Sequence, residues 1–447
     1  MRKTGMRFGL HLLFWLLLLA IPAAMLALSS EFYLKSFATD DALYYPIIAR
    51  NIVNGLGSTY DDGMTMTNGY HPLWAWLQVG VALLFGDYTS MVYLWWVKAL
   101  TVATVVLSLI VWGGVIRRLF EDEAPAAIFL ILLGGYWWSI YTLYSGMETP
   151  LVVLMMGLVL RQLQKLITET TYRLSSSLLL GLLMAGTLLA RLDSIFFIGC
   201  VSLAVTILLF RRRWLWPFLT TFTVTILAVI PYLIWNLVNF GSLMPVSGLR
   251  KTPGLRLDTG MATLAHFWGN KVDKLLDLFG WPGVSLMLLV GAVVLILARQ
   301  EFATALRKWG IAWTLVAGAI LHYTYISFFM TEGDIHWYQY AEYLTVYLLL
   351  ATGGYAVSLW LRASRWPQLS WAPVAGVGLF VLAILVFYAP GTLVNPVNVR
   401  TYDSAIWARE HTPRTARFGM YDSGVFHFVA ERPTLSMNGL AGDEVLL

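Results

Sequence analysis

The adjacent carboxylates Asp40 and Asp41 are the first candidates for chemistry in this 447-residue chain. Charge is scarce, because only 12% of the residues are charged and 58% are hydrophobic. A general base must reach the proton that it removes, whereas a neighbouring carboxylate can cap a helix or orient a substrate. Adjacent helical side chains point about 100° apart. We therefore expect only one aspartate to face a given cavity, beside Tyr44, with the other in a supporting role.

Two further ionisable side chains stand where apolar runs begin. His71 follows an Asn-Gly turn and precedes Pro72, which suits the first turn of a helix. There the imidazole could donate a hydrogen bond to a phosphate, although an ordinary interfacial histidine is the simpler interpretation. Glu148 precedes Thr149-Pro150 at the start of another apolar run. An acid in this setting either caps the helix or belongs to a functional site.

Basic side chains that suit a phosphate fall in similar segments. Arg191 and Asp193 interrupt two apolar runs, which predicts either an ion pair across a tight turn or an arginine presented to an anionic headgroup. Arg250 and Lys251 form a compact basic group in a later polar segment. A last group combines aromatic and ionisable side chains at another turn: His336, Tyr338, Tyr340 and Glu342. Together these residues predict a site that holds acids and phosphate-binding cations.

Several other kinds of site are not supported by the sequence. No set of His, Cys and Asp residues has good metal-ligand spacing, and neither a P-loop nor a dinucleotide fingerprint occurs. The chemistry requires no cofactor, although a divalent ion between the aspartate pair and Glu148 is compatible with the residues. The basic residues fall in short loops without interleaved aromatics, which argues against nucleic-acid binding. The single cysteine, Cys200, lies in an apolar run and allows no intrachain disulfide.

Composition predicts an all-α polytopic membrane protein. Soluble domains carry about 25% charged residues, twice the proportion found here, and the mean hydropathy is +0.69. A membrane-crossing helix needs about 20 apolar residues. Windows of that length predict about eleven spans, near residues 10–28, 89–115, 125–144, 147–163, 175–190, 194–210, 216–240, 281–298, 310–330, 341–361 and 372–390.

The distribution of basic residues predicts the orientation of the chain in the membrane. The apolar piece from Pro72 to Gly86 is shorter than a span. If it does not cross, every strongly basic short loop falls on the same side as the N-terminus, which the positive-inside rule makes cytoplasmic. The candidate residues then face the outside of a cell or inner membrane. We predict an uncleaved N-terminal anchor and a juxtamembrane or re-entrant helix at Pro72–Gly86.

Three segments are predicted to lie outside the membrane on that face. Within a membrane domain of residues 1–390 these are 29–88 and 241–280, and residues 391–447 follow as a small α/β segment. In the last segment we expect a helix over 401–410 and strands over 416–421 and 433–437, with turns at Ser423-Gly424 and Asn438-Gly439. Because the chain ends soon after these strands, we expect the natural domain to continue beyond Leu447.

The ordered set of these motifs resembles the glycosyltransferase class C (GT-C) superfamily of polyprenyl-phosphate-sugar-dependent membrane enzymes. The resemblance covers most of the chain. It rests on the first-loop Asp40-Asp41 with the following Ile-Ala-Arg-Asn, then Asn-Gly-Tyr-His71-Pro-Leu-Trp, Ser-Gly-Met-Glu148-Thr, Leu-Ala-Arg191-Leu-Asp193-Ser, Phe-Gly-Ser-Leu-Met-Pro-Val-Ser-Gly and Trp407-Ala-Arg-Glu-His-Thr-Pro. Pro46 and the short C-terminal segment depart from the family's pattern.

The resemblance implies an inverting transfer of a sugar from a lipid phosphate to an acceptor hydroxyl. By that resemblance an aspartate of the first outer loop is the general base, Asp40 or Asp41, and of these we favour Asp40. His71, Arg191, Arg250 and Lys251 would hold the donor phosphate as it leaves. Around them, Glu148, Tyr44, His336 and Tyr338 would line the cavity or bind the acceptor, which the sequence leaves open as a glycan, lipid or protein.

Two other functions compete with the glycosyltransferase interpretation. A secondary transporter predicts inverted repeats and broken helices at mid-membrane, and the sequence contains no convincing internal repeat. A lipid-linked oligosaccharide ligase of envelope assembly would use a diphosphate donor and need no first-loop base. The aspartate pair therefore separates the leading interpretation from both alternatives.

Overall fold

Long apolar helices make up most of the computed structural model, which describes residues 18–85, 91–171, 173–211, 215–252, 280–330 and 336–439. In these ranges eight helices are long and apolar enough to cross a membrane, which confirms the all-α polytopic class. They are α5 (Met91–Phe120), α8 (Thr149–Thr168), η2 with α10 (Leu192–Arg211), α11 (Leu215–Phe240), Gly280–Leu297, η3 with α15 (Gly310–Phe329), α16 (Tyr340–Ala363) and η5 with α17 (Pro367–Phe387).

Two bent helix pairs raise the number of candidate spans among the described residues to ten. The helix Leu18–Ala27 meets α2 (Ser30–Ser36) at 111°, and α6 (Glu123–Gly135) meets α7 (Trp137–Leu143) at 61°. The predicted span near 175–190 is α9 (Leu174–Ala190), an apolar helix of 17 residues that is shorter than the others. The described residues thus contain eight to ten candidate spans, compared with the eleven that the sequence predicts. The first half of the predicted anchor lies outside the described residues.

Lys98 stabilises the first of these bends. Its ammonium group donates a hydrogen bond to the carbonyl of Leu28, where the helix Leu18–Ala27 gives way to α2. A carbonyl at a helix end has no partner inside its own helix. The architecture thereby explains a buried lysine in the first third of α5 without a ligand.

Close helix–helix contacts hold the bundle together. α9 packs along α11, α5 along α8, and α16 along α6. At the first of these contacts a Cβ added to Gly181 would lie 2.6 Å from the carbonyl oxygen of Thr221, so the approach of the two backbones requires glycine. Small residues at such crossings are typical of membrane helices.

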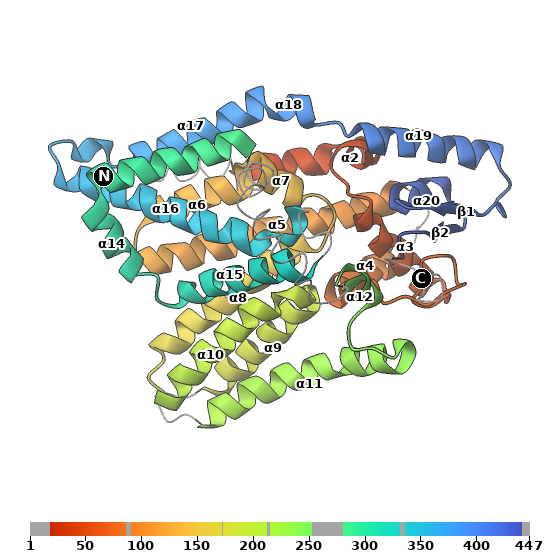
Figure 1. Ribbon diagram of the computed structural model, residues 1–447, viewed down its shortest axis with the longest axis horizontal. Coiled ribbons are helices and arrows are strands. Elements are labelled where there is room, and N and C mark those ends of the chain that lie inside the picture. Colours follow the sequence, from red (N-terminus) through yellow and green to blue (C-terminus); the bar gives the residue numbers. More distant parts are fainter. Residues whose placement is uncertain are drawn as a thin grey trace.

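One end of the bundle carries the short elements that build the site (Figure 1). There η1 (Asp41–Leu43) leads into α3 (Tyr44–Val53), and α4 (Pro72–Phe85), α12 (Val246–Lys251) and α19 (Pro396–His411) lie nearby. The short helix η4 (His336–Tyr338) also belongs to this end, whereas α18 (Ala389–Thr392) follows α17 along the bundle. Pro46 occupies the first turn of α3, where its missing N–H needs no partner. Gly55 follows the end of that helix with φ +77°, as expected of a helix terminator.

The C-terminal segment is a small β-α-β unit on the same end of the bundle. Strands β1 (Phe418–Met420) and β2 (Thr434–Ser436) pair in parallel, with Phe418 opposite Thr434. The helix that connects them, α20 (Gly424–Ala430), begins where the sequence predicts a turn at Ser423-Gly424. That prediction is wrong because a partner far away in the chain supplies the hydrogen bonds that start this helix, as described below.

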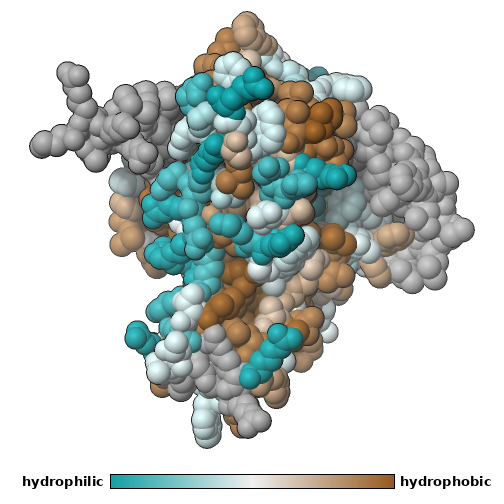
Figure 2. Space-filling model, turned by 90° about the vertical axis from the view of Figure 1, so that its left-hand side faces the viewer, coloured by the Kyte–Doolittle hydropathy of each residue, from teal (hydrophilic) through white to brown (hydrophobic). Residues whose placement is uncertain are grey.

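The opposite end of the bundle is rich in hydrophilic side chains (Figure 2). It includes α14 (Arg299–Arg307) and the C-terminal ends of α5 and α16. Polar contacts tie these elements together, since Lys308 donates to the carbonyl of Phe120 at 2.8 Å and Arg362 donates to Asp122 at 2.5 Å. Within the described ranges, charged residues therefore gather at both ends of an apolar bundle.

Candidate active site

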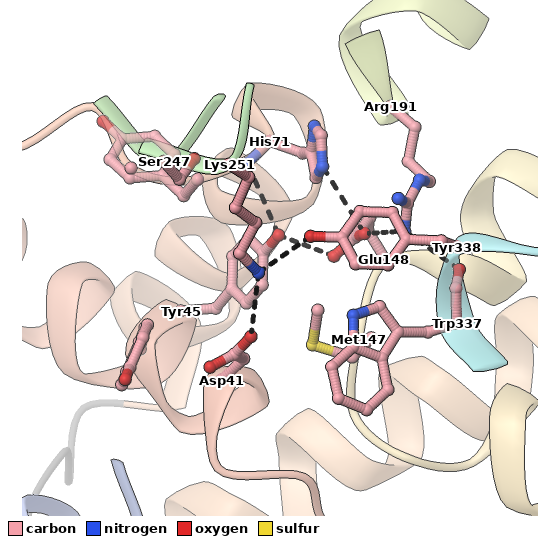
Figure 3. A pocket seen from close by; sticks show the side chains of 13 residues that line it. Asp41, Tyr45, His71, Met147, Glu148, Arg191, Ser247, Lys251, Trp337 and Tyr338 are labelled. Carbon is pink, nitrogen blue, oxygen red and sulfur yellow. Dashed lines mark hydrogen bonds and ion pairs between the residues drawn. The ribbon is translucent and has the colours of Figure 1, made fainter. Parts of the chain in front are cut away.

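A cavity of about 50 Å³ lies among the short elements at the first end of the bundle. Six segments that are distant in sequence meet there: η1 with α3, the turn before α4, the turn before α8, the junction of α9 and η2, α12, and η4. The wall consists of polar, ionisable and aromatic side chains (Figure 3). Its residues are Asp41, Tyr44, Tyr45, Gly69, Tyr70, His71, Met147, Glu148, Arg191, Ser247, Lys251, Trp337 and Tyr338.

Asp41 faces the cavity opposite a lysine. Its carboxylate Oδ2 lies 3.9 Å from Nζ of Lys251, and its side chain is 21% exposed. The Lys251 ammonium also donates a hydrogen bond to the hydroxyl of Tyr338 at 2.9 Å and lies 5.2 Å from the centre of that ring. An acid, a cation and a phenol therefore share one side of the cavity (Figure 3).

Asp40 points away from the cavity. Its two carboxylate oxygens accept the backbone N–H groups of Gly424 and Val425, at 2.9 and 3.0 Å, and it does not line the cavity. Burial raises the pKa of Asp40 to about 6, and the two N–H groups counteract part of this rise. The sequence favours Asp40 as the base, but the Asp40 side chain contacts the C-terminal segment and not the cavity.

Glu148 is fully buried at the other side of the cavity. Its Oε1 accepts a hydrogen bond from Nη1 of Arg191 at 2.5 Å, and its Oε2 accepts one from the Tyr45 hydroxyl at 2.6 Å. Although Glu148 directly precedes α8, its side chain makes no capping hydrogen bond there. The carboxylate instead ties α3 to the junction of α9 and η2.

Arg191 is almost completely enclosed, with 1% of its side chain exposed. Besides Glu148 it binds both carboxylate oxygens of Asp193, at 3.0 and 2.7 Å, and donates to the carbonyl of Trp337 at 3.1 Å. The rings of Tyr338 and Tyr340 lie on the guanidinium at about 5 Å. The sequence leaves open an ion pair with Asp193 or an arginine presented to a headgroup. The structure forms the ion pair with Asp193, and Glu148 is a second carboxylate bound to Arg191.

His71 lies beside Glu148 and the junction of α9 and η2. Its Nδ1 accepts the backbone N–H of Leu192 at 3.4 Å, and its Nε2 lies 3.6 Å from Glu148. Burial lowers the pKa of His71, so the ring is neutral at pH 7. With Nδ1 occupied as an acceptor, the proton resides on Nε2, which therefore acts as a hydrogen-bond donor toward the cavity.

An amide pair holds α12, and with it Lys251, against the first loop. The side chains of Asn68 and Asn236 are fully buried and bond to each other at 3.1 Å. Asn68 also accepts the backbone N–H of Val246 at 2.9 Å, and Asn236 donates to the carbonyl of Leu243 at 3.1 Å. These bonds use the polar groups at the start of α12 and so determine where its basic residues lie.

Besides Asp40, two of the predicted site residues lie outside the cavity wall. Arg250 is an exposed neighbour of Lys251 on α12. His336 packs against the ring of Tyr141 with centroids 4.8 Å apart, and burial lowers its pKa to about 4. The remaining predicted residues are brought together: Asp41, Tyr44, His71, Glu148, Arg191, Lys251 and Tyr338 all line the cavity.

A polar network behind Arg191 is not apparent from the sequence alone. His322, in the apolar helix α15, places Nδ1 3.0 Å from Glu342 and Nε2 3.4 Å from Asp193. The one available signal is the presence of ionisable residues within apolar helices, which usually find buried partners. No group of three or more His, Cys, Asp or Glu side chains suited to a metal ion occurs within the described ranges.

The fold and the site define a polytopic α-helical membrane protein with a charged cavity at one end of its bundle. Comparison with solved structures shows that other membrane proteins share this fold. ArnT from Cupriavidus metallidurans bound to undecaprenyl phosphate superposes with a TM-score of 0.61 at 15% identity, over 96% of this chain and 86% of ArnT.

The oligosaccharyltransferase of Archaeoglobus fulgidus has the same fold. Its complex with zinc and sulfate superposes with a TM-score of 0.55 at 14% identity, and the complex of AglB with an inhibitory peptide and a dolichol-phosphate superposes with 0.53 at 13%. This chain spans 62% and 65% of the length of those two chains. Neither the protein-family models nor the curated protein sequences contain a match to this chain.

Proposed function

We propose that this protein is an integral-membrane glycosyltransferase that moves a sugar from a polyprenyl-phosphate donor to an acceptor hydroxyl. The observation that carries the proposal is Asp41, a carboxylate that faces Lys251 at 3.9 Å across a cavity at the end of an apolar helix bundle. A fold shared with proteins solved with undecaprenyl phosphate and with a dolichol-phosphate supports a lipid-phosphate donor. The reaction takes place on the extracytoplasmic side, according to the distribution of basic residues along the chain.

In this proposal Asp41 is the general base. It removes the proton of the acceptor hydroxyl while that oxygen bonds to the anomeric carbon of the sugar. The bond between this carbon and the phosphate oxygen breaks, its electron pair leaves with the lipid phosphate, and attack from the opposite face inverts the anomeric configuration. Asp41 suits this role better than Asp40, because both oxygens of Asp40 accept backbone N–H groups away from the cavity.

Lys251 carries the main part of donor-phosphate binding. A fixed cation stabilises the negative charge that develops on the leaving phosphate. The Tyr338 hydroxyl, 2.9 Å from the Lys251 ammonium, and Nε2 of His71 add hydrogen-bond donors in the same cavity. Arg250, exposed on α12, contributes little to this step.

Arg191 and Glu148 shape the opposite wall. Because Arg191 already binds two carboxylates, its charge is largely neutralised before any donor arrives. We assign it to holding Tyr338, Tyr340 and Glu148 in place, with a secondary part in phosphate binding. Glu148, bonded to Tyr45 on the helix that follows Asp41, keeps that helix in register with the cavity.

Transfer from defined donors tests the assignment of the base. Asp41→Asn should lower the transfer rate from polyprenyl-phosphate-linked hexoses or pentoses by about 10² to 10⁴-fold, the usual contribution of a general base. Asp403→Asn, on the exposed face of α19, is the matched control and should keep wild-type rates. Transfer that persists in Asp41→Asn would contradict the role of base. A preference for polyprenyl-diphosphate donors would favour an oligosaccharide ligase instead.

A further inference from the structure

The Asp40 side chain does not bond to the helix that it precedes. Asp40 stands before η1, yet it makes no capping hydrogen bond there. Its partners are the N–H groups of Gly424 and Val425, 384 and 385 residues away in sequence. These are the first two residues of α20, and the first N–H groups of a helix have no partner inside that helix. Asp40 therefore caps the N-terminus of α20 from a distant part of the chain.

Gly424 brings the backbone of α20 directly against the backbone of Asp40. A Cβ at position 424 would lie 2.1 Å from the carbonyl oxygen of Asp40 and 3.2 Å from its Oδ2. The same carbonyl oxygen accepts the N–H of Leu43 at 3.0 Å, which closes the turn that contains Asp41. The start of α20 thus presses on the peptide group from which the Asp41 turn begins.

Three more polar contacts connect the C-terminal segment, residues 413–439, with the stretch around Asp41. They join Ser423 to Tyr60 at 2.8 Å, Asn438 to Tyr44 at 3.1 Å and His427 to Arg50 at 3.3 Å. The cavity residues Asp41 and Tyr44 lie between two of the anchored positions, Asp40 and Arg50, in sequence. The wall of the cavity is therefore held from behind by the C-terminal segment.

We propose that Asp40 is a positioning residue that anchors the C-terminal segment to the first loop, and that this anchor directs the Asp41 carboxylate into the cavity. The proposal rests on the role of Asp41 as general base given above. One peptide bond joins the two aspartates, so a rotation of the Asp40 backbone displaces the Asp41 side chain. A displacement of about 1 Å at a reacting group can lower a rate about 100-fold.

Hydrogen–deuterium exchange on the full chain in detergent tests the anchor without reference to catalysis. Asp40→Ala removes both acceptors and Gly424→Ala forces the two backbones apart, so each should speed exchange of the amides at 424–425 by about tenfold or more. Asp40→Asn keeps one acceptor oxygen and should give an intermediate rate. Asp41→Asn and the exposed control Asp403→Ala should exchange as the wild type does. Unchanged protection in Asp40→Ala would overturn the anchor.

Transfer kinetics with a polyprenyl-phosphate sugar then test positioning. Asp40→Ala and Gly424→Ala should each lower kcat by about 10- to 100-fold and leave the donor KM within about twofold. Because they break the same contact, the double variant should be no slower than the slower single variant. Faster exchange at 424–425 with a wild-type kcat would overturn the positioning role. If Asp41→Asn keeps full transfer, the proposed base is wrong, whereas the exchange result still decides the anchor.

Discussion

Arg191 and Lys251 both line the cavity, but their surroundings differ. Arg191 lies at the end of α9, and two carboxylates, a carbonyl and two aromatic rings surround it. Lys251 lies on the short helix α12 and faces the partly exposed Asp41 at 3.9 Å. We call these the enclosed wall and the loop wall.

The difference teaches that a cation in a cavity is not by itself a ligand-binding group. Burying a charge is costly unless it is paired, and the enclosed wall meets this cost with its own carboxylates. On the loop wall, water reaches the carboxylate opposite the lysine, so an anionic ligand can replace water there. The enclosed wall therefore supports the structure, and the loop wall carries the proposed chemistry. The predictions below test this division, from the largest expected effect to the smallest.

Removing the cation of the enclosed wall, Arg191, should mainly lower the stability of the protein. Arg191→Met leaves Glu148 and Asp193 as buried carboxylates without their main cation, and breaking a buried pair in this way costs about 3–5 kcal/mol. Thermal unfolding in detergent should show a clearly lower apparent Tm and a lower yield of folded protein. Arg250→Met removes an exposed cation and should change stability by no more than about 0.5 kcal/mol. An unchanged Tm in Arg191→Met would contradict the comparison.

Removing the cation of the loop wall, Lys251, should mainly lower the rate of sugar transfer. Lys251→Met should lower kcat/KM for a polyprenyl-phosphate sugar by about 10- to 100-fold, because a hydrogen bond to a charged group contributes about 1.5–3 kcal/mol. Its effect on the apparent Tm should stay well below that of Arg191→Met, since the side chain of Asp41 is 21% exposed. Arg250→Met on the same helix is the control and should transfer at the wild-type rate. A large loss of Tm with normal kinetics would reverse the roles of the two walls.

A pH experiment sharpens the comparison on the loop side, where Asp40 lies behind Asp41. The pKa of Asp40 is raised from 3.8 to about 6, so the folded protein binds this proton more tightly than the unfolded chain does. Asp40 therefore contributes more stability at low pH, and this contribution is lost as the pH rises through about 6. Between pH 7 and pH 5 the contribution should grow by about 1 kcal/mol.

The measurement compares the apparent Tm of the wild type with that of Asp40→Asn across this pH range. The difference between the two proteins should move in favour of the wild type as the pH falls from 7 to 5. A difference that stays constant with pH would show that Asp40 does not titrate in this range. The other carboxylates are common to both proteins, so their titration cancels in the comparison.

Much of the framework could be predicted from sequence patterns. Long apolar runs predict long helices wherever the chain must satisfy its own backbone groups in a membrane, and Pro72 begins α4 as expected. The helix expected over 401–410 is α19 (Pro396–His411). Charged and polar residues between apolar runs end up at the helix ends, which explains why most of the candidate residues meet at one cavity.

Choices between neighbouring residues could not be predicted. Asp40 and Asp41, like Arg250 and Lys251, have the same chemistry one position apart, and the direction of each side chain depends on a contact from elsewhere in the chain. For Asp40 that contact is α20, and for Lys251 it is the Asn68–Asn236 pair that holds α12. The sequence predicts a turn at the start of α20 for the same reason, because local sequence carries no information about a cap that is 384 residues away.

The sequence alone determined the class of protein, the approximate positions of its apolar helices and the chemical types gathered in its polar segments. These follow from hydropathy and from local turn chemistry, which act over a few residues to a few turns of helix. The tertiary structure decided which aspartate faces the cavity, which cation is already neutralised and which segment holds the aspartate pair in place. Those outcomes depend on burial and on hydrogen bonds between distant segments, and such interactions exist only once the chain has folded.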